Sequence, residues 1–242
     1  MKALILAGGQ GKRLAPLTHN IPKCLLEIGG KTILEHMLDV LVACGKETFT
    51  EIIIVSGFHH EKVIALIGQS YKGLHITHCV NTEYPTTNTL YGLFVARDFL
   101  NDAFIQIHGD LLFHKDVLQT IISSPVDDAI VISSNPTTFV SDGNRVKVAD
   151  GRVSEINKLM PYTESEGRAF GIYKFSQGGA AIYMRHVDAQ QDKIKEGFEI
   201  ALRPTLTEVP FGIIDIQALP FAEIDDVPDF ERAKNKMKEI LT

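Results

Sequence analysis

Near the N-terminus, residues 4–14 read LILAGGQGKRL and residues 15–23 read APLTHNIPK. A short apolar run here ends in a glycine-rich turn, and basic residues follow the turn. Glycines let the backbone turn sharply and bring its N–H groups close to the oxygens of an anion. The pattern predicts a strand that leads into a backbone-lined anion site, with Lys12, Arg13 and Lys23 as the cations available to it.

Two common phosphate-binding motifs do not fit this turn. A dinucleotide-binding fingerprint needs a third glycine where Leu14 stands, and a P-loop needs Ser or Thr where Arg13 stands. A bare Gly-Gly-x-Gly sequence is also compatible with a purely structural turn after an edge strand. Arg13 and Lys23 favour the anion site, because together they can neutralise a triphosphate.

Composition limits the classes of partner. The chain has 242 residues, of which 45% are hydrophobic, which is typical of a soluble fold with a sizeable core. The net charge of −6 gives no support for a nucleic-acid or anionic-membrane surface, and no apolar stretch reaches the roughly 18 residues of a membrane span.

The three cysteines, Cys24, Cys44 and Cys79, are scattered and odd in number, which favours a reducing compartment. Since no signal peptide follows Met1, we expect a cytoplasmic protein that binds neither nucleic acid nor a membrane.

Strand and helix signals alternate through the first half of the chain. The expected strands are residues 2–7, 51–56, 75–80, 104–108 and 129–133, and the expected helices are residues 32–44, 60–67, 88–99 and 115–122. Thr32 and Glu35 have the spacing of a capping box at the start of the first of these helices. Repeated β-α units predict a parallel sheet with helices on both faces and right-handed crossovers.

The second half changes character, because a hairpin signal appears at Asp150-Gly151. The expected strands are residues 145–148, 152–156, 170–175, 212–216 and 221–224, and the expected helices are residues 177–192, 198–206 and 227–241. Asp226 is the expected N-cap of the last helix. We expect one domain over residues 1–242, with an inserted or appended lobe at roughly residues 140–212.

The N-terminal pattern resembles that of the nucleotide-sugar pyrophosphorylase superfamily of nucleotidyltransferases, through LAGGQGKRL, PLT and PK. The match is specific over residues 3–27, and weaker similarity extends over most of the chain; Lys12 stands where the family usually carries Thr or Ser. The resemblance implies a Rossmann-like, three-layer α/β/α fold with a mixed sheet (GT-A-like) and a small acceptor-binding lobe. It also implies that an acceptor's phosphate or phosphonate oxygen attacks the α-phosphorus of a bound nucleoside triphosphate and releases pyrophosphate.

The resemblance also implies where the nucleotide binds. The expected nucleotide-binding residues are Leu6, Ala7, Gly8, Gly9, Gly11, Arg13, Lys23, Asn81, Thr87 and Asn88. Residues 81–88 read NTEYPTTN, which is similar to the cytidylyltransferase branch, notably the phosphocholine and aminoalkylphosphonate enzymes. We therefore expect CTP, although a plain loop with a helix N-cap would produce a similar segment.

Two aspartates follow predicted strands. A carboxylate at the carboxyl end of a strand in an open α/β sheet points into the ligand crevice. By the resemblance, Asp110 and Asp225 bind Mg²⁺, a cation that prefers hard oxygen ligands. Glu223 is a weaker candidate for this metal, and His108 is expected on the other face of its strand from Asp110.

The lobe is expected to bind the acceptor. By the resemblance, Lys158 contacts the acceptor's phosphate and joins Arg13 and Lys23 as a catalytic residue. Tyr162, Tyr173 and Glu199, with Phe170 and Glu166, are candidates for an aromatic and acidic pocket around a cationic head group. The phosphocholine enzymes of the branch that this chain resembles tend to use Trp around the quaternary amine; this chain contains no Trp, which argues against choline itself.

Two other functions remain open at this stage. The first is a sugar-1-phosphate nucleotidylyltransferase that uses UTP, dTTP or GTP; the lack of a Gly-rich element near Thr87 and the Asn at position 157 argue against it. The second is a catalytically inactive regulatory or binding paralogue, which we would expect to have lost a metal aspartate or a phosphate-binding cation. The sequence is compatible with a monomer or a homodimer.

Overall fold

The computed structural model describes residues 1–135, 143–217 and 219–241. The central strands are β1 (Lys2–Ala7), β4 (Glu51–Ser56), β5 (Ser70–Tyr71), β6 (Leu74–Val80), β7 (Phe104–His108), β9 (Ala129–Ser133), β10 (Arg145–Ala149), β11 (Arg152–Asn157), β12 (Gly167–Phe175) and β13 (Gly212–Asp215). Two small sheets pair β2 (Glu27–Ile28) with β3 (Lys31–Thr32), and β8 (Leu111–Phe113) with β14 (Phe221–Glu223). The α-helices are α1 (Ile33–Ala43), α2 (His60–Ile67), α3 (Thr89–Ala96), α4 (Lys115–Ser123), α5 (Gln177–Ala189), α6 (Glu199–Glu208) and α7 (Val227–Leu241).

The central sheet is mixed. Its order is β11-β10-β12-β7-β1-β4-β6-β5, and β9 pairs with both β12 and β13. Strands β7, β1, β4 and β6 run parallel, as the alternating signals of the first half predicted. Strand β12 runs antiparallel to both β7 and β9 and joins the two parts of the sheet. The structure thus confirms the expected α/β class and its mixed sheet.

Side chains that alternate along β1 explain the three layers. Ala3, Ile5 and Ala7 pack into one core cluster with residues of α1, α2 and α4. Leu4 belongs to a second cluster, which contains residues of α3, α5 and α6. Because successive strand residues point to opposite faces, one apolar strand anchors helices on both sides of the sheet.

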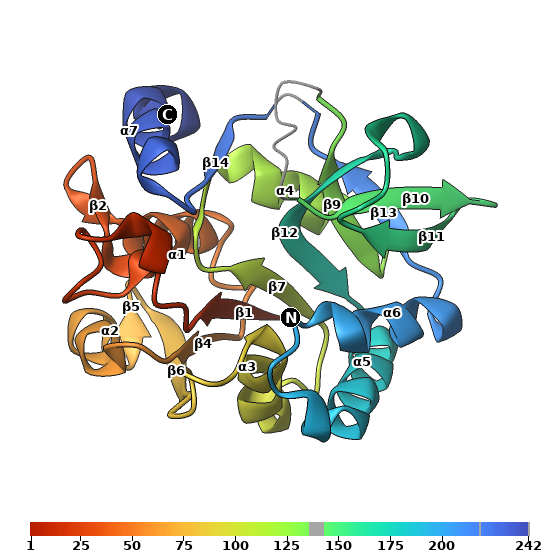
Figure 1. Ribbon diagram of the computed structural model, residues 1–242, viewed down its shortest axis with the longest axis horizontal. Coiled ribbons are helices and arrows are strands. Elements are labelled where there is room, and N and C mark those ends of the chain that lie inside the picture. The colour runs from red at the N-terminus through yellow and green to blue at the C-terminus, as the bar shows by residue number, and fades with distance from the viewer. Residues whose placement is uncertain (136–142, 218, 242) are drawn as a thin grey trace.

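The segment at residues 140–212 continues the sheet through its strands. Strands β10 and β11 form the predicted antiparallel hairpin and lie on the side of the molecule opposite α1 and α2 (Figure 1). The start of the expected segment, residues 140–142, lies outside the described residues. Strand β12 begins at Gly167, three positions before the predicted start at Phe170, and so brings Arg168 into the sheet.

The sequence predicted several helix ends correctly. Thr32 and Glu35 form the expected capping box of α1, in which the Glu35 N–H donates to Thr32 Oγ1 over 3.1 Å. Helix α7 begins after Asp226, whose carboxylate accepts from the Asp229 N–H. The predicted helices at residues 88–99 and 177–192 each end earlier and continue as 3₁₀ turns, at Arg97–Phe99 and Gln191–Lys193. Within the described ranges, no helix combines the length and apolar character needed to cross a membrane.

Candidate active site

The glycine-rich turn after β1 lines a cavity of about 460 Å³, which we call the first cavity. Gly11 has a φ of +64°, a conformation that favours glycine, and the Thr18 hydroxyl donates to its carbonyl oxygen over 2.8 Å. A β-carbon at position 11 would lie 3.1 Å from the Lys23 β-carbon, because the segment with Lys23 packs directly on the turn. This packing therefore places Lys23 beside the carboxyl end of β1.

All ten predicted nucleotide-binding residues line the first cavity, together with Asp110 and Asp225. These residues come from four separate stretches of the chain, which meet at the carboxyl ends of the parallel strands. The cavity also contains Lys12, the third cation expected near the turn, and residues that the sequence did not single out for this role, among them Gln10, Cys24 and Val55. The glycine-rich turn, the base-binding candidates and the two aspartates therefore share one cavity.

Asp110 and Asp225 meet around one ammonium group. The Nζ atom of Lys23 lies 2.7 Å from Asp110 Oδ2 and 2.9 Å from Asp225 Oδ1. Arg13 Nη2 lies 3.2 Å from the second oxygen of Asp225. The backbone holds the two aspartates together as well, because the Ile224 N–H donates to the Asp110 carbonyl oxygen over 3.0 Å.

The charges in this cluster stabilise one another. Burial alone would lower the pKa of Lys23, but its attraction to Asp110 and Asp225 outweighs burial and raises that pKa. Burial alone would raise the pKa of Asp110, and the ammonium group of Lys23 is the main cause that instead holds the pKa below its usual range. Lys23 and Asp110 are therefore both charged at neutral pH.

The two carboxylates fit a divalent cation. Oδ1 of Asp110 is buried and has no hydrogen-bond partner within the described residues, so it can bind a cation. The part of the chain that the structure describes has no cluster of three or more His, Cys, Asp or Glu side chains that could hold a metal. Two carboxylates without a third protein ligand suit Mg²⁺, which completes its octahedral shell with water and substrate phosphates.

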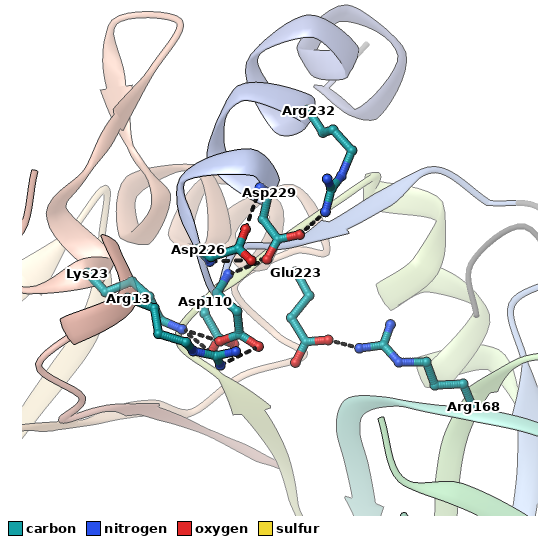
Figure 2. A network of polar contacts seen from close by, with 9 residues as sticks. Arg13, Lys23, Asp110, Arg168, Glu223, Asp226, Asp229 and Arg232 are labelled. Carbon is teal, nitrogen blue, oxygen red and sulfur yellow. Dashed lines mark hydrogen bonds and ion pairs between the residues drawn. The ribbon is translucent and has the colours of Figure 1, made fainter. Parts of the chain in front are cut away.

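Asp229 positions Asp225, a role that the sequence did not predict. Its Oδ2 atom accepts from the N–H groups of Asp225 and Asp226 over 3.0 and 3.1 Å. Its other oxygen pairs with Arg232 (Figure 2). The first turn of α7 thus fixes the backbone of Asp225, and Asp226 is occupied as a helix cap.

A second cavity of about 760 Å³ adjoins the first. Five residues line both cavities: Arg13, Asn88, Thr89, His108 and Asp225. The acceptor candidates Lys158, Tyr173 and Glu199 line it. Oε1 of Glu199 accepts from the Asn144 side chain over 2.8 Å. The two cavities therefore meet beside Asp225.

Three aromatic candidates for the acceptor site have other surroundings. Tyr173 is only 1% exposed, and its ring lies 5.0 Å from that of Phe198, so it forms part of the core beneath the second cavity. Tyr162 lies over the Arg145 guanidinium at 4.0 Å and lines neither cavity. Phe170 packs in the core against Phe221.

His108 contacts both cavities, whereas the sequence placed it on the face away from Asp110. The expectation was wrong because residues two apart along a strand share a face, so that alternation along β7 itself favours the same side for His108 and Asp110. Nε2 of His108 is buried without a hydrogen-bond partner in the described residues, and the ring packs edge-on against Phe198. Burial lowers the pKa of His108 and keeps its imidazole neutral.

Replacement of Gly109 by Ala is expected to displace Asp110. A β-carbon at position 109 would lie 2.8 Å from both the Ala7 Cα and the Leu6 carbonyl oxygen, which are backbone atoms that cannot rotate away. We expect G109A to cost about 1–3 kcal/mol of unfolding free energy and at least about tenfold in activity. The matched control is G178A, which meets only one atom within 4 Å; urea unfolding and turnover of both variants would measure the difference. Equal values would contradict this tight packing.

Comparisons with known proteins identify the family of this chain. The family model described as nucleotidyl transferase matches residues 2–203. The chain therefore belongs to the nucleotidyl transferase family, and it is a nucleotidyltransferase by that membership.

The relatives differ in their substrates. The chain is 29% identical over 194 residues to a CTP:phosphoglutamine cytidylyltransferase of Campylobacter jejuni, covering 73% of each protein. It is 33% identical over 117 residues to a UTP–glucose-1-phosphate uridylyltransferase of Haloferax volcanii, a match that spans 48% of this chain and 46% of the relative. The solved inositol-1-phosphate CTP transferase of T. maritima has the same fold, with a TM-score of 0.78 at 17% identity over 100% of this chain and 97% of that one.

Proposed function

We propose that this nucleotidyltransferase is Mg²⁺-dependent and transfers CMP from CTP to a small phosphorylated alcohol or phosphonate, with release of pyrophosphate. The observation that carries the choice of CTP is the hydrogen bonding of Asn81. Among the relatives, the cytidylyltransferase that acts on phosphoglutamine supports the same choice. The nucleotide would occupy the first cavity and the acceptor the second.

The amide of Asn81 is oriented by its neighbours. Thr87 Oγ1 donates its one hydrogen to the Glu83 carbonyl oxygen over 2.8 Å, so it can only accept from Asn81. Nδ2 of Asn81 is therefore the atom that faces Thr87, at 3.0 Å. This leaves Oδ1 of Asn81 buried in the cavity lining without a partner in the described residues. An acceptor there matches the exocyclic amino group of cytosine, whereas uracil and thymine have a carbonyl oxygen at that ring position and offer only the ring N3–H as a donor.

The reaction needs positioning and charge neutralisation more than proton transfer. An oxygen of the acceptor's phosphate is already ionised near neutral pH, since its second pKa is about 6. That oxygen forms a bond to the α-phosphorus of CTP, and the bond from that phosphorus to the bridging oxygen breaks. The electron pair leaves with pyrophosphate. Arg13 and Lys23 stabilise the negative charge, Lys158 positions the attacking group, and Mg²⁺ held by Asp110 and Asp225 would supply further charge neutralisation.

The surroundings of Asn157 support a small acceptor over a sugar 1-phosphate. Asn157 lines the second cavity, but both polar atoms of its side chain are engaged locally. Its Nδ2 donates to Glu155 over 3.0 Å and its Oδ1 accepts from the Leu159 N–H over 2.9 Å. The residue is therefore a poor ligand for a sugar hydroxyl. The uridylyltransferase among the relatives keeps the sugar enzyme as the second candidate.

Replacing Asn81 with Leu is expected to reduce the preference for CTP over UTP by about tenfold or more, because a buried amide would no longer pair with the base. Thr82→Ala, an exposed neighbour, is the matched control and is expected to keep the preference. The measurement is kcat/KM for both nucleotides. An unchanged ratio in N81L would mean that another residue reads the base.

Thermal shift with each nucleoside triphosphate and Mg²⁺ tests the choice of nucleotide without an acceptor. CTP is expected to stabilise the protein most. Stabilisation by UTP, dTTP or GTP and none by CTP would contradict the choice of CTP.

Pyrophosphate release over a panel of phosphorylated alcohols, phosphonates and sugar 1-phosphates then tests the acceptor. No release with any acceptor and any nucleotide would favour the inactive paralogue.

A further inference from the structure

Arg168 is a buried arginine to which neither the sequence motifs nor the proposed reaction assigns a role. It is the second residue of β12, is 4% exposed and lines the second cavity. A glycine makes room for it, because a β-carbon at position 143 would lie 2.2 Å from Arg168 Nε. Charged side chains are rarely buried this far unless they are paired, so its hydrogen bonding is informative.

Most donors of this guanidinium lack a partner among the residues that the structure describes. Arginine has five N–H donors in a rigid plane. Within the described residues, Glu223 accepts a hydrogen bond from Nη2 of Arg168, and Nε is buried without a partner. Leaving a buried donor unpaired is unfavourable. A donor set of this kind is suited to a planar or tetrahedral oxyanion that enters the cavity.

Glu223 fixes where the guanidinium lies. It ends β14, two residues before Asp225, and Figure 2 shows it between Arg168 and the group formed by Asp110 and Arg13. The ion pair therefore links β12 to β14, the strand that ends two residues before the proposed metal ligand Asp225. Arg168 is thus held within the second cavity, next to but outside the cluster around Lys23.

We propose that Arg168 is an acceptor-binding residue, which binds an oxyanion of the acceptor through the donors that Glu223 leaves unused. The inference rests on the proposed function, since it gives the second cavity to the acceptor. The oxyanion is the acceptor's phosphate or a carboxylate beside it, and both share the chemistry of a charge-assisted, forked hydrogen bond. Lys158, in the same cavity, supplies a point charge and not this fork.

The test is calorimetric binding to the enzyme saturated with Mg²⁺ and a non-reactive α,β-methylene analogue of CTP. The two probes are O-phosphoethanolamine and O-phosphoserine, which differ by one carboxylate. The variants are R168M, R168K, which keeps a cation beside Glu223 in case R168M does not fold, and R152M, an exposed arginine on β11, as the control. The analogue is expected to bind all of them equally.

We expect both Arg168 variants to weaken probe binding by about tenfold or more, while R152M binds like the wild type. An equal loss for both probes identifies the phosphate as the ligand of Arg168, and a loss for O-phosphoserine alone identifies the carboxylate. The inference is wrong if the wild type binds neither probe, or if the folded variants bind both as the wild type does. Failure of the wild type to bind the CTP analogue would instead contradict the proposed function, and this inference with it.

Discussion

Replacing Asp110 with Asn is expected to lower kcat/KM for pyrophosphate release by at least about 100-fold, since even the residues behind a metal ligand contribute 10–100-fold. Asp110 follows β7 and provides a buried oxygen that has no hydrogen-bond partner in residues 1–135, 143–217 and 219–241. An amide keeps the shape of this side chain but removes the charge that attracts Mg²⁺ and Lys23. We therefore expect the apparent affinity for Mg²⁺ to fall together with the rate.

Asp226→Asn is the matched control for this variant. It makes the same chemical change close to the second proposed metal ligand, but Asp226 caps α7, and Asn is as good a cap as Asp. We expect D226N to keep activity and Mg²⁺ dependence near those of the wild type. Equal losses in D110N and D226N would mean that general charge, and not a metal site at Asp110, determines activity.

Replacing Lys23 with Met is expected to reduce kcat by about 10²–10³-fold, the range for loss of one preorganised donor at a developing charge. The variant also leaves two carboxylates facing each other without the ammonium that now separates them. Without Mg²⁺ we expect a lower Tm than the wild type. With Mg²⁺ the Tm should recover by more than it rises in the wild type, because the cation then replaces a missing positive charge.

The Tm measurement separates this account from a simple loss of packing. Lys115→Met removes a cation at an exposed position on α4 and is the control, with a Mg²⁺ response expected to equal that of the wild type. If K23M lost stability and Mg²⁺ did not restore it preferentially, Lys23 would have a structural role at this site and not an electrostatic one.

Much of the fold could be predicted, because local signals and tertiary packing agree in the first half of the chain. The apolar run before Gly8 does form a central strand, and Thr32 does cap α1 through Glu35. The ten residues expected to bind the nucleotide line one cavity, since motifs at the carboxyl ends of parallel strands meet at one edge of a sheet. Their individual roles stay predictions.

The parts that could not be predicted depend on contacts between distant segments. No local pattern indicates that Lys23 lies between Asp110 and Asp225, because 87 and 202 residues separate the partners. Arg168 escaped notice since the apolar signal of β12 starts after it, at Phe170. The side of His108, by contrast, could have been predicted, because residues two apart along a strand share a face.

The most direct test of the central claim follows the α-phosphorus. CTP labelled at that position is incubated with the enzyme, Mg²⁺ and the acceptor panel, and the label and the released pyrophosphate are both measured. We predict that the label appears in a CMP–acceptor conjugate, in amounts equal to the pyrophosphate released. Transfer of label from UTP, dTTP or GTP but not from CTP, or no transfer from any nucleotide, would contradict the account.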